Sequence, residues 1–203
     1  MRIFLAGASG LIGIRLTPLL IAAGHTVAGM TRSPAKAGQL SELGARPVVC
    51  DVFDTFALNQ AVTAFAPDLV FHQLTDLPDD VSQISAYGAR NGRVRTEGTR
   101  NLIAAAAAAA GTSRLIAQSI SWELATEAAR AVTAAHERAV IAAGGVVIRY
   151  GQFHGPGTYY PDEPPPPPRV HLDDAARQTM ATLTVPAGMT VVIDDRASQR
   201  TVA

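Results

Sequence analysis

A glycine-rich turn near the start of the chain constrains the fold more than any other feature. Residues 2–6 form a short apolar run, three glycines follow, and an amphipathic segment continues to about residue 23. This order of strand, turn and helix start suits a nicotinamide dinucleotide, because glycine lets the backbone approach the pyrophosphate and a helix N-terminus offers unpaired N–H groups. The alternative is an ordinary turn whose glycines serve packing alone. The residues expected to hold the dinucleotide are Gly7, Ser9, Gly10, Leu11, Ile12 and Gly13.

The rest of the chain alternates between apolar runs and helical patterns. The apolar runs cover residues 2–6, 26–30, 46–49, 69–73, 115–118, 146–149 and 190–193. The helical patterns cover residues 11–23, 34–43, 55–65, 93–110, 122–143 and 172–183. Such alternation indicates a parallel sheet with both faces covered. We therefore expect one α/β domain over residues 1–203, a doubly wound Rossmann sheet of about seven strands with helices on both faces.

Glycine and proline mark the expected ends of these elements. Gly24, Gly44 and Gly111 follow helical patterns and are expected to cap them. Residues 164–168 are all proline, which predicts an extended loop, since such a run fits neither a helix nor a central strand.

Composition excludes several classes of protein. Lys plus Arg and Asp plus Glu number 17 each among 203 residues, so the formal net charge is zero and a nucleic-acid partner is not expected. The single cysteine, Cys50, permits no internal disulfide and is expected to be buried packing. The most apolar helical stretch, residues 102–110, is too short to span a membrane. With no secretory signal expected at the N-terminus, we predict a cytoplasmic protein without a membrane partner.

The second and third apolar runs end in residues that bear on cofactor choice. Thr31, Arg32 and Ser33 follow the second run, where an acidic residue would favour NAD, so we predict NADP, with NAD as the alternative. Arg32 could instead stack on the adenine. Asp51 and Val52 are placed to touch the adenine, although Asp51 could also cap the following helix, a role for which Asp54 competes.

Several further segments, in order, carry a family resemblance. They are residues 68–75, residues 97–102, residues 149–157 and residues 170–176. With the glycine turn, they resemble the extended or atypical short-chain dehydrogenases/reductases of the NAD-dependent epimerase/dehydratase group. The resemblance implies a homodimer built by the helices at 102–110 and 122–143. It also implies further cofactor contacts from Gln73, Leu74, Thr75, Ser119 and Tyr150.

The chain departs from this family at its chemistry. The family uses a tyrosine and a lysine one helical turn apart, in which the lysine lowers the pKa of the tyrosine. Counting back from Glu137, which matches the family's glutamate, places Ala129 and Thr133 at those positions, and Arg95 replaces a family asparagine. The family's long insertion is reduced to a proline-rich loop over residues 158–170, which predicts a shallow, open crevice.

Other polar residues are candidates for the chemistry. Ser119 and Ser121 end the fifth apolar run, where they could contact a substrate or only bond to backbone. His154, with Tyr150, Tyr159 and Tyr160, is expected to form a polar aromatic cluster that contacts the substrate or, as the alternative, only closes the floor of the crevice. His72 is expected to be structural. His136 is expected to be a solvated helix residue, with a role as an acid/base as the alternative. No spacing of His, Cys, Asp and Glu suggests a metal site.

Two hypotheses follow from these observations. The first is an NADP-dependent oxidoreductase or epimerase-like enzyme that acts on a small carbonyl or sugar-like substrate without the tyrosine and lysine. The second is a non-catalytic NADP(H)-binding sensor or partner subunit, which the missing catalytic pair would explain. A weaker third is a fold reused for chemistry without the cofactor.

Overall fold

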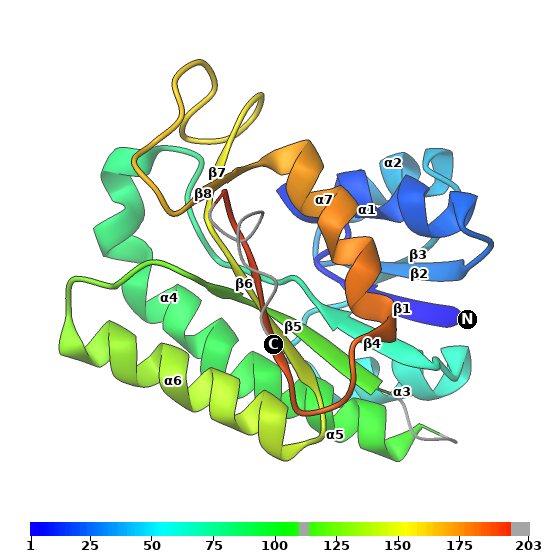
Figure 1. Ribbon diagram of the computed structural model, residues 1–203. Coiled ribbons are helices and arrows are strands. Elements are labelled where there is room, and N and C mark those ends of the chain that lie inside the picture. Colours follow the sequence, from blue (N-terminus) through cyan, green and yellow to red (C-terminus); the bar gives the residue numbers. More distant parts are fainter. Residues whose placement is uncertain (110–113, 196–203) are drawn as a thin grey trace.

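The fold is a seven-stranded parallel sheet between two layers of helices (Figure 1). The computed structural model describes residues 1–109 and 114–195. The strand order is β3-β2-β1-β4-β5-β6-β9, so the predicted doubly wound sheet and its seven strands are confirmed. Their bounds are β1 Arg2–Ala6, β2 Thr26–Thr31, β3 Arg46–Val49, β4 Leu69–His72, β5 Arg114–Ile120, β6 Val146–Tyr150 and β9 Thr190–Ile193.

The strand order reverses at β1, which pairs with β2 on one side and with β4 on the other. In open α/β sheets a ligand crevice forms outside the carboxyl ends of the strands at such a switch point. The glycine turn leaves β1 at this edge. The topology therefore brings the turn, the end of β2 and the end of β4 together.

Each face of the sheet carries its own core and its own helices. Along β1, Ile3 and Leu5 enter one core whereas Phe4 and Ala6 enter the other, as the two-residue period of a strand requires. The first core packs against α1 (Leu11–Ala22), α2 (Ala37–Glu42) and α7 (Leu172–Ala181). The second core packs against α3 (Thr55–Phe65), α5 (Thr99–Ala108) and α6 (Glu127–Ala142).

Capping residues set where several helices begin and end. Asp54 accepts from the Ala57 amide at the start of α3, and Thr126 accepts from the Ala129 amide at the start of α6. The predicted helix at 122–143 therefore begins five residues later than expected, and residues 122–126 form a loop. Gly24 and Gly44 adopt the predicted positive φ after α1 and α2, whereas Gly111 lies outside the described residues.

The predicted helix at 93–110 is a composite of three pieces. The helical segment begins at Gly88, five residues earlier than predicted, and α5 ends at Ala108. It consists of α4 (Gly88–Arg93), a π-helical turn (Val94–Gly98) and α5, and a 3-10 segment at Val81–Tyr87 precedes it. The π-helical turn holds one more residue per turn than an α-helix, which hydrophobic periodicity does not reveal.

A small second sheet was not expected from the sequence. β7 (Gln152–His154) and β8 (Arg169–His171) pair in parallel beyond the carboxyl end of β6. The proline run lies between them in neither helix nor strand, as predicted. A side chain at Gly151 would lie 2.7 Å from the Arg169 backbone, so glycine permits this close approach.

Two composition-based expectations can be compared with the structure. Cys50 is buried, as predicted, and burial raises the pKa of its thiol to about 11. Among residues 1–109 and 114–195, no helix has the length and apolar character needed to cross a membrane.

Candidate active site

The glycine turn is packed too tightly for side chains at two of its three glycines. Gly7 has φ +91°, and a Cβ there would lie 2.5 Å from the Gln73 carbonyl oxygen at the end of β4. A Cβ at Gly13 would lie 2.3 Å from the Gly7 carbonyl oxygen. Gly10 differs, because its Cβ would approach only the Gly7 oxygen, at 3.3 Å. The surface in front of Gly10 is therefore open to a ligand.

The N-terminus of α1 lacks the capping side chain that satisfies a backbone amide at the start of some other helices of this chain. Gly10 is its N-cap and supplies no side chain, and the first turn contains no acidic residue. By contrast, Asp54 caps α3 and Thr126 caps α6. An uncapped N-terminus retains unpaired amides and a partial positive charge, which suit an anion. These groups fit the pyrophosphate of a dinucleotide.

Hydroxyl groups connect the glycine turn to the end of β2. Ser9 Oγ and Thr31 Oγ1 are 2.8 Å apart, and the Ser33 amide donates to Thr31 Oγ1 over 3.2 Å. These contacts fix the backbone on either side of Arg32, which the sequence assigns to the cofactor.

Arg32 forms an ion pair that the sequence did not reveal. Its Nη2 donates to Asp76 Oδ1 over 3.0 Å, and Arg90 binds the same carboxylate through Nε and Nη2. Burial opposes ionisation of Asp76, yet the two arginines hold the pKa of its carboxyl below the usual value. The Arg32 side chain is still 58% exposed, so it can turn toward a ligand.

The next two predicted cofactor residues, Asp51 and Val52, follow β3. Asp51 is exposed and accepts from the Phe53 amide over 2.9 Å, whereas Asp54 caps α3. Val52 is buried, and its carbonyl accepts from Asn101 Nδ2 over 3.0 Å. Asn101 thus holds the segment that follows β3, a role that its place in the 97–102 motif could have suggested.

Gln73, Leu74 and Thr75 continue β4 beneath the glycine turn. The Leu74 carbonyl accepts from Gln118 Nε2 over 3.0 Å, and Thr75 is exposed. Gln73 Oε1 is buried without a hydrogen-bond partner among the described residues. This loop therefore presents an unsatisfied acceptor at the switch point.

Tyr150 lies in the core below this loop. Its hydroxyl is 2.6 Å from Thr179 Oγ1, and Gln73 Nε2 donates to it over 3.4 Å. Burial raises the pKa of the Tyr150 hydroxyl to about 12. Because the residue is only 2% exposed, it offers almost no surface for the predicted direct contact and instead supports Gln73.

Ser119 belongs to a charged network between β5, β6 and α6. Its hydroxyl donates to Glu137 Oε1 over 2.6 Å, and Arg149 Nε donates to the same oxygen over 2.9 Å. Burial opposes ionisation of the Glu137 carboxyl, but the hydrogen bonds from Arg149 and Ser119 keep its pKa below the usual value. Nearby, Ser121 Oγ is buried and has no hydrogen-bond partner in the described chain. Glu137 therefore holds the Ser119 hydroxyl in one direction.

An open cavity adjoins this network at the carboxyl end of β5. We call it the β5 cavity, and its volume is about 410 Å³. It lies against the loop before α6, which exists because Thr126 starts that helix late. Its lining residues are Ile120, Ser121, Trp122, Glu123, Leu124, Arg130, Thr133, Ala134, Glu137 and Arg149.

The prediction for His136 was wrong. This residue is only 2% exposed, and it joins His72 in a buried network through Thr99. Thr99 Oγ1 lies 3.1 Å from His72 Nε2 and 2.7 Å from His136 Nδ1, and His136 Nε2 lies 2.9 Å from the Gln118 carbonyl oxygen. Burial lowers the pKa of both imidazoles. The structural role predicted for His72 is confirmed.

The predicted aromatic cluster does not form. His154 packs edge-on against His171, with ring centroids 5.3 Å apart. Tyr159 donates to the Pro78 carbonyl, and Tyr160 donates to Gln152 Oε1 over 3.4 Å. Tyr150 lies in the core, and the His154 ring contacts His171, which belongs to a polar network other than that of Ser119. The three predicted catalytic residues therefore do not share one network of contacts.

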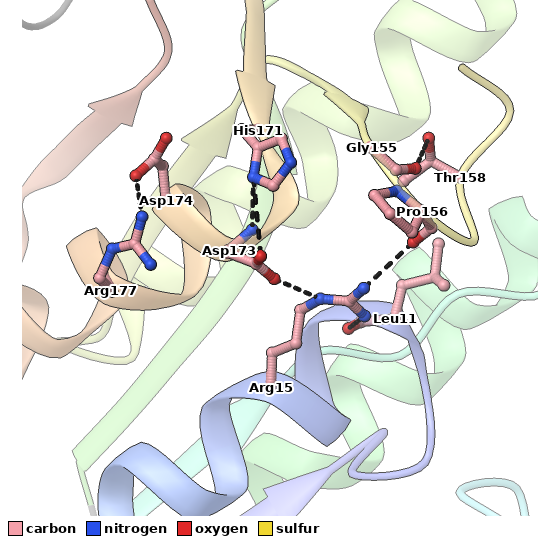
Figure 2. Close-up of polar contacts among 9 residues, drawn as sticks. All are labelled: Leu11, Arg15, Gly155, Pro156, Thr158, His171, Asp173, Asp174 and Arg177. Carbon is pink, nitrogen blue, oxygen red and sulfur yellow. Dashed lines mark hydrogen bonds and ion pairs between the residues drawn. The ribbon is translucent and has the colours of Figure 1, made fainter. Parts of the chain in front are cut away.

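That other network fastens the loop after β7 to the start of α1 (Figure 2). Arg15 Nε donates to Asp173 Oδ1 over 2.7 Å, and Arg15 Nη2 donates to the Pro156 carbonyl over 3.1 Å. The Thr158 hydroxyl donates to the Gly155 carbonyl over 2.8 Å. Arg15 therefore holds residues 155–158 beside the uncapped helix N-terminus.

Within residues 1–109 and 114–195, no group of three His, Cys, Asp or Glu side chains is arranged to hold a metal ion. The features of the site instead define a dinucleotide-binding protein. They are a glycine turn at the switch point, an uncapped α1 and a buried β4 loop beneath it.

The chain belongs to the NAD(P)H-binding family, whose model matches residues 7–145. A Streptomyces protein described as 3-diazoavenalumate denitrifying reductase is 38% identical over 187 residues, covering 79% of this chain and 59% of the relative. The chain thus spans about 59% of the length of that relative.

Solved structures share the fold at low sequence identity. The UDP-glucose 4-epimerase of Thermus thermophilus in complex with NAD matches with a TM-score of 0.75 at 20% identity, over 96% of this chain and 78% of that one. The anaerobillin reductase ChuY of Escherichia coli O157:H7 matches with a TM-score of 0.70 at 20% identity, over 96% of this chain and 98% of that one. The fold that the resemblance to the epimerase/dehydratase group implies is confirmed.

Proposed function

We propose that this protein is an NADP(H)-dependent reductase of a small organic molecule. The observation that carries the proposal is the uncapped, glycine-lined start of α1 beside the β4 loop. The Streptomyces relative, named as a reductase, supports reduction over binding alone. ChuY, whose matched length is 98% of its chain, supports a reductase of this compact form.

Arg32 supports NADP over NAD as the cofactor. Its guanidinium lies at the end of β2 with more than half of its surface exposed, and Arg90 adds a second positive charge at Asp76. A 2′-phosphate dianion can be held by such a group through charge-assisted hydrogen bonds. NAD carries a hydroxyl in place of this phosphate, so it would gain less binding free energy from Arg32.

The residues of the chain suit an acceptor that needs no proton. When bound, NADPH supplies hydride equivalents from its nicotinamide ring. Ser119 cannot readily give up a proton, because its O–H is directed at the ionised Glu137. The relative's name describes denitrification of a diazo compound. Replacement of an aryl diazonium group by hydrogen releases N₂ with the C–N bonding pair and consumes no proton.

A small carbonyl or sugar-like substrate, as the sequence predicts, would need a proton source. Ser121 is the available candidate, because its hydroxyl makes no hydrogen bond within the described residues. We therefore propose a diazonium-like acceptor first, and a carbonyl acceptor with Ser121 as donor second.

The test is NADPH oxidation, followed by absorbance, with a benzenediazonium salt and with a panel of aldehydes, ketones and nucleotide sugars. We expect protein-dependent oxidation with the diazonium salt, and controls without protein and with Gly10→Ala measure the uncatalysed background. Oxidation with carbonyls that Ser121→Ala abolishes would support the second acceptor instead. No protein-dependent oxidation with any acceptor would refute the reductase.

A non-catalytic sensor or partner subunit is the competing function. Ala129 and Thr133, at the positions of the family's tyrosine and lysine, favour it. Tight NADPH binding with no transfer to any acceptor is the result that would select it. A cytoplasmic homodimer through α5 and α6 is proposed from the resemblance, and light scattering on the purified protein tests the dimer.

A further inference from the structure

The β5 cavity has more positive charge around it than its lining first suggests. Its cations are Arg130 and Arg149, and its carboxylates are Glu123 and Glu137. The Glu137 carboxylate already accepts hydrogen bonds from Arg149 and Ser119. Glu123 is 86% exposed and 3.9 Å from Arg130, so it is largely screened by solvent. The two carboxylates therefore do not give the β5 cavity a net negative charge.

A third cation lies directly behind the cavity wall. Arg95 Nη1 donates to Thr133 Oγ1 over 2.9 Å, and Thr133 lines the cavity. Among the described residues, no carboxylate oxygen lies within 4.0 Å of a guanidinium nitrogen of Arg95, so Arg95 forms no ion pair there. Burial lowers the pKa of its guanidinium, and only the field of Glu137 opposes this. Arg95 thus brings a positive charge that is not paired directly with a carboxylate in the described chain and is only partly compensated by the field of Glu137.

Such a charge is costly to the fold. Arg95 is half-buried, and a cation that is partly withdrawn from water without a paired carboxylate is less favourable to the fold than an apolar side chain of similar length. Arg95 also occupies the π-helical turn at Val94–Gly98, and such turns are frequent at functional sites. Both features indicate that Arg95 serves a ligand.

The walls of the cavity define the body of that ligand. Ile120, Trp122 and Leu124 contribute apolar surface beside the arginines. The volume of about 410 Å³ falls in the range of small-molecule sites. A planar organic acid meets both requirements, with its ring on the apolar wall and its carboxylate near the cations.

We propose that the β5 cavity binds the carboxylate of a small planar organic acid, with Arg95 and Arg130 supplying the compensating charge. This inference rests on the proposed function and deepens it, because it names the class of molecule that is reduced. That class is an aromatic compound that carries a carboxylate. Arg95 acts across Thr133 as a positioning residue and need not touch the reacting atoms.

The experiment compares cinnamate with cinnamamide, which have nearly the same shape and differ in charge. Binding of each to the full chain with NADP⁺ present is measured by calorimetry. We expect cinnamate to bind at least about tenfold more tightly than the amide, and Arg95→Met to remove that preference without weakening the amide. Arg95→Lys keeps the charge and is expected to retain most of the preference.

Arg138→Met is the matched control, because it removes a charge from the exposed side of α6 outside the β5 cavity. It should leave both affinities unchanged. Thermal melting provides a second measurement, in which Arg95→Met should be at least as stable as the wild type. Equal affinities for acid and amide, or a loss of both in Arg95→Met, would overturn the inference. Such a result would leave NADPH oxidation with acceptors that carry no carboxylate, such as the benzenediazonium salt, and hence the proposed function, intact.

Discussion

Replacing Gly10 with alanine should abolish tight cofactor binding while the fold persists. Gly10 has φ −84°, which alanine adopts without strain, and the new Cβ would approach only the Gly7 oxygen, at 3.3 Å. The methyl group therefore projects into the space before α1, where the pyrophosphate is proposed to lie. Loss of one charge-assisted hydrogen bond to phosphate costs about 1.5–3 kcal/mol, which weakens binding about 10- to 150-fold.

The cost to stability should be much smaller. Alanine is a poorer N-cap than glycine by about 0.5–1 kcal/mol, which lowers the melting temperature of a chain of this size by about 1–4 °C. Gly13→Ala provides the contrast, because its Cβ would lie 2.3 Å from a carbonyl oxygen and should cost about 1–3 kcal/mol or more. Gly38→Ala is the control, since nothing lies within 4 Å of its Cβ.

The assay is titration of each variant with NADPH, followed by nucleotide fluorescence, together with thermal melting by circular dichroism. The expected pattern is NADPH binding that is weakened about 10- to 150-fold with a retained fold in Gly10→Ala, and unchanged binding in Gly38→Ala. If Gly10→Ala binds NADPH as tightly as the wild type, the pyrophosphate does not lie at this turn.

Three further predictions concern other parts of the molecule. Burial lowers the pKa values of His72 and His136, so below pH about 6.5 the unfolded chain binds more protons than the folded chain does. The free energy of unfolding should therefore fall as the pH drops from about 6.5. Equal midpoints of urea unfolding at pH about 7 and about 5 would contradict this. Arg32→Ala should weaken NADP⁺ binding about tenfold and leave NAD⁺ unchanged in calorimetry, and equal loss of both would exclude a 2′-phosphate contact. Arg15→Ala removes the links to Asp173 and Pro156 and should lower the melting temperature by about 3 °C, whereas the exposed Arg177→Ala should have no measurable effect; equal effects would argue against the fastening role.

The sequence predicted the sheet well because its signals are local. Apolar runs, capping glycines and the glycine turn each depend on a few neighbouring residues, and all seven strands appeared where expected. The start of α6 was misplaced because residues 122–125, which include Glu, Leu and Ala, are all compatible with a helix, and only the capping bond of Thr126 decides the boundary.

The candidate site was harder to predict, because its contacts join distant positions. Arg32 meets Asp76 across 44 residues, and Arg95 meets Thr133 across 38. His136 was expected to be solvated because a histidine on a helix surface usually is, yet the helix turns it toward Thr99 and the β5 backbone. These pairings depend on how elements pack, which hydrophobic periodicity does not encode.

The buried thiol at the end of β3 offers a practical advantage. Cys50 is the single cysteine of the chain, and a pKa of about 11 keeps it protonated and unreactive toward maleimides at neutral pH. One cysteine introduced in the exposed proline-rich segment could therefore be labelled selectively in an otherwise native protein. A fluorophore there would report in real time whether that segment moves when nucleotide or organic acid is added.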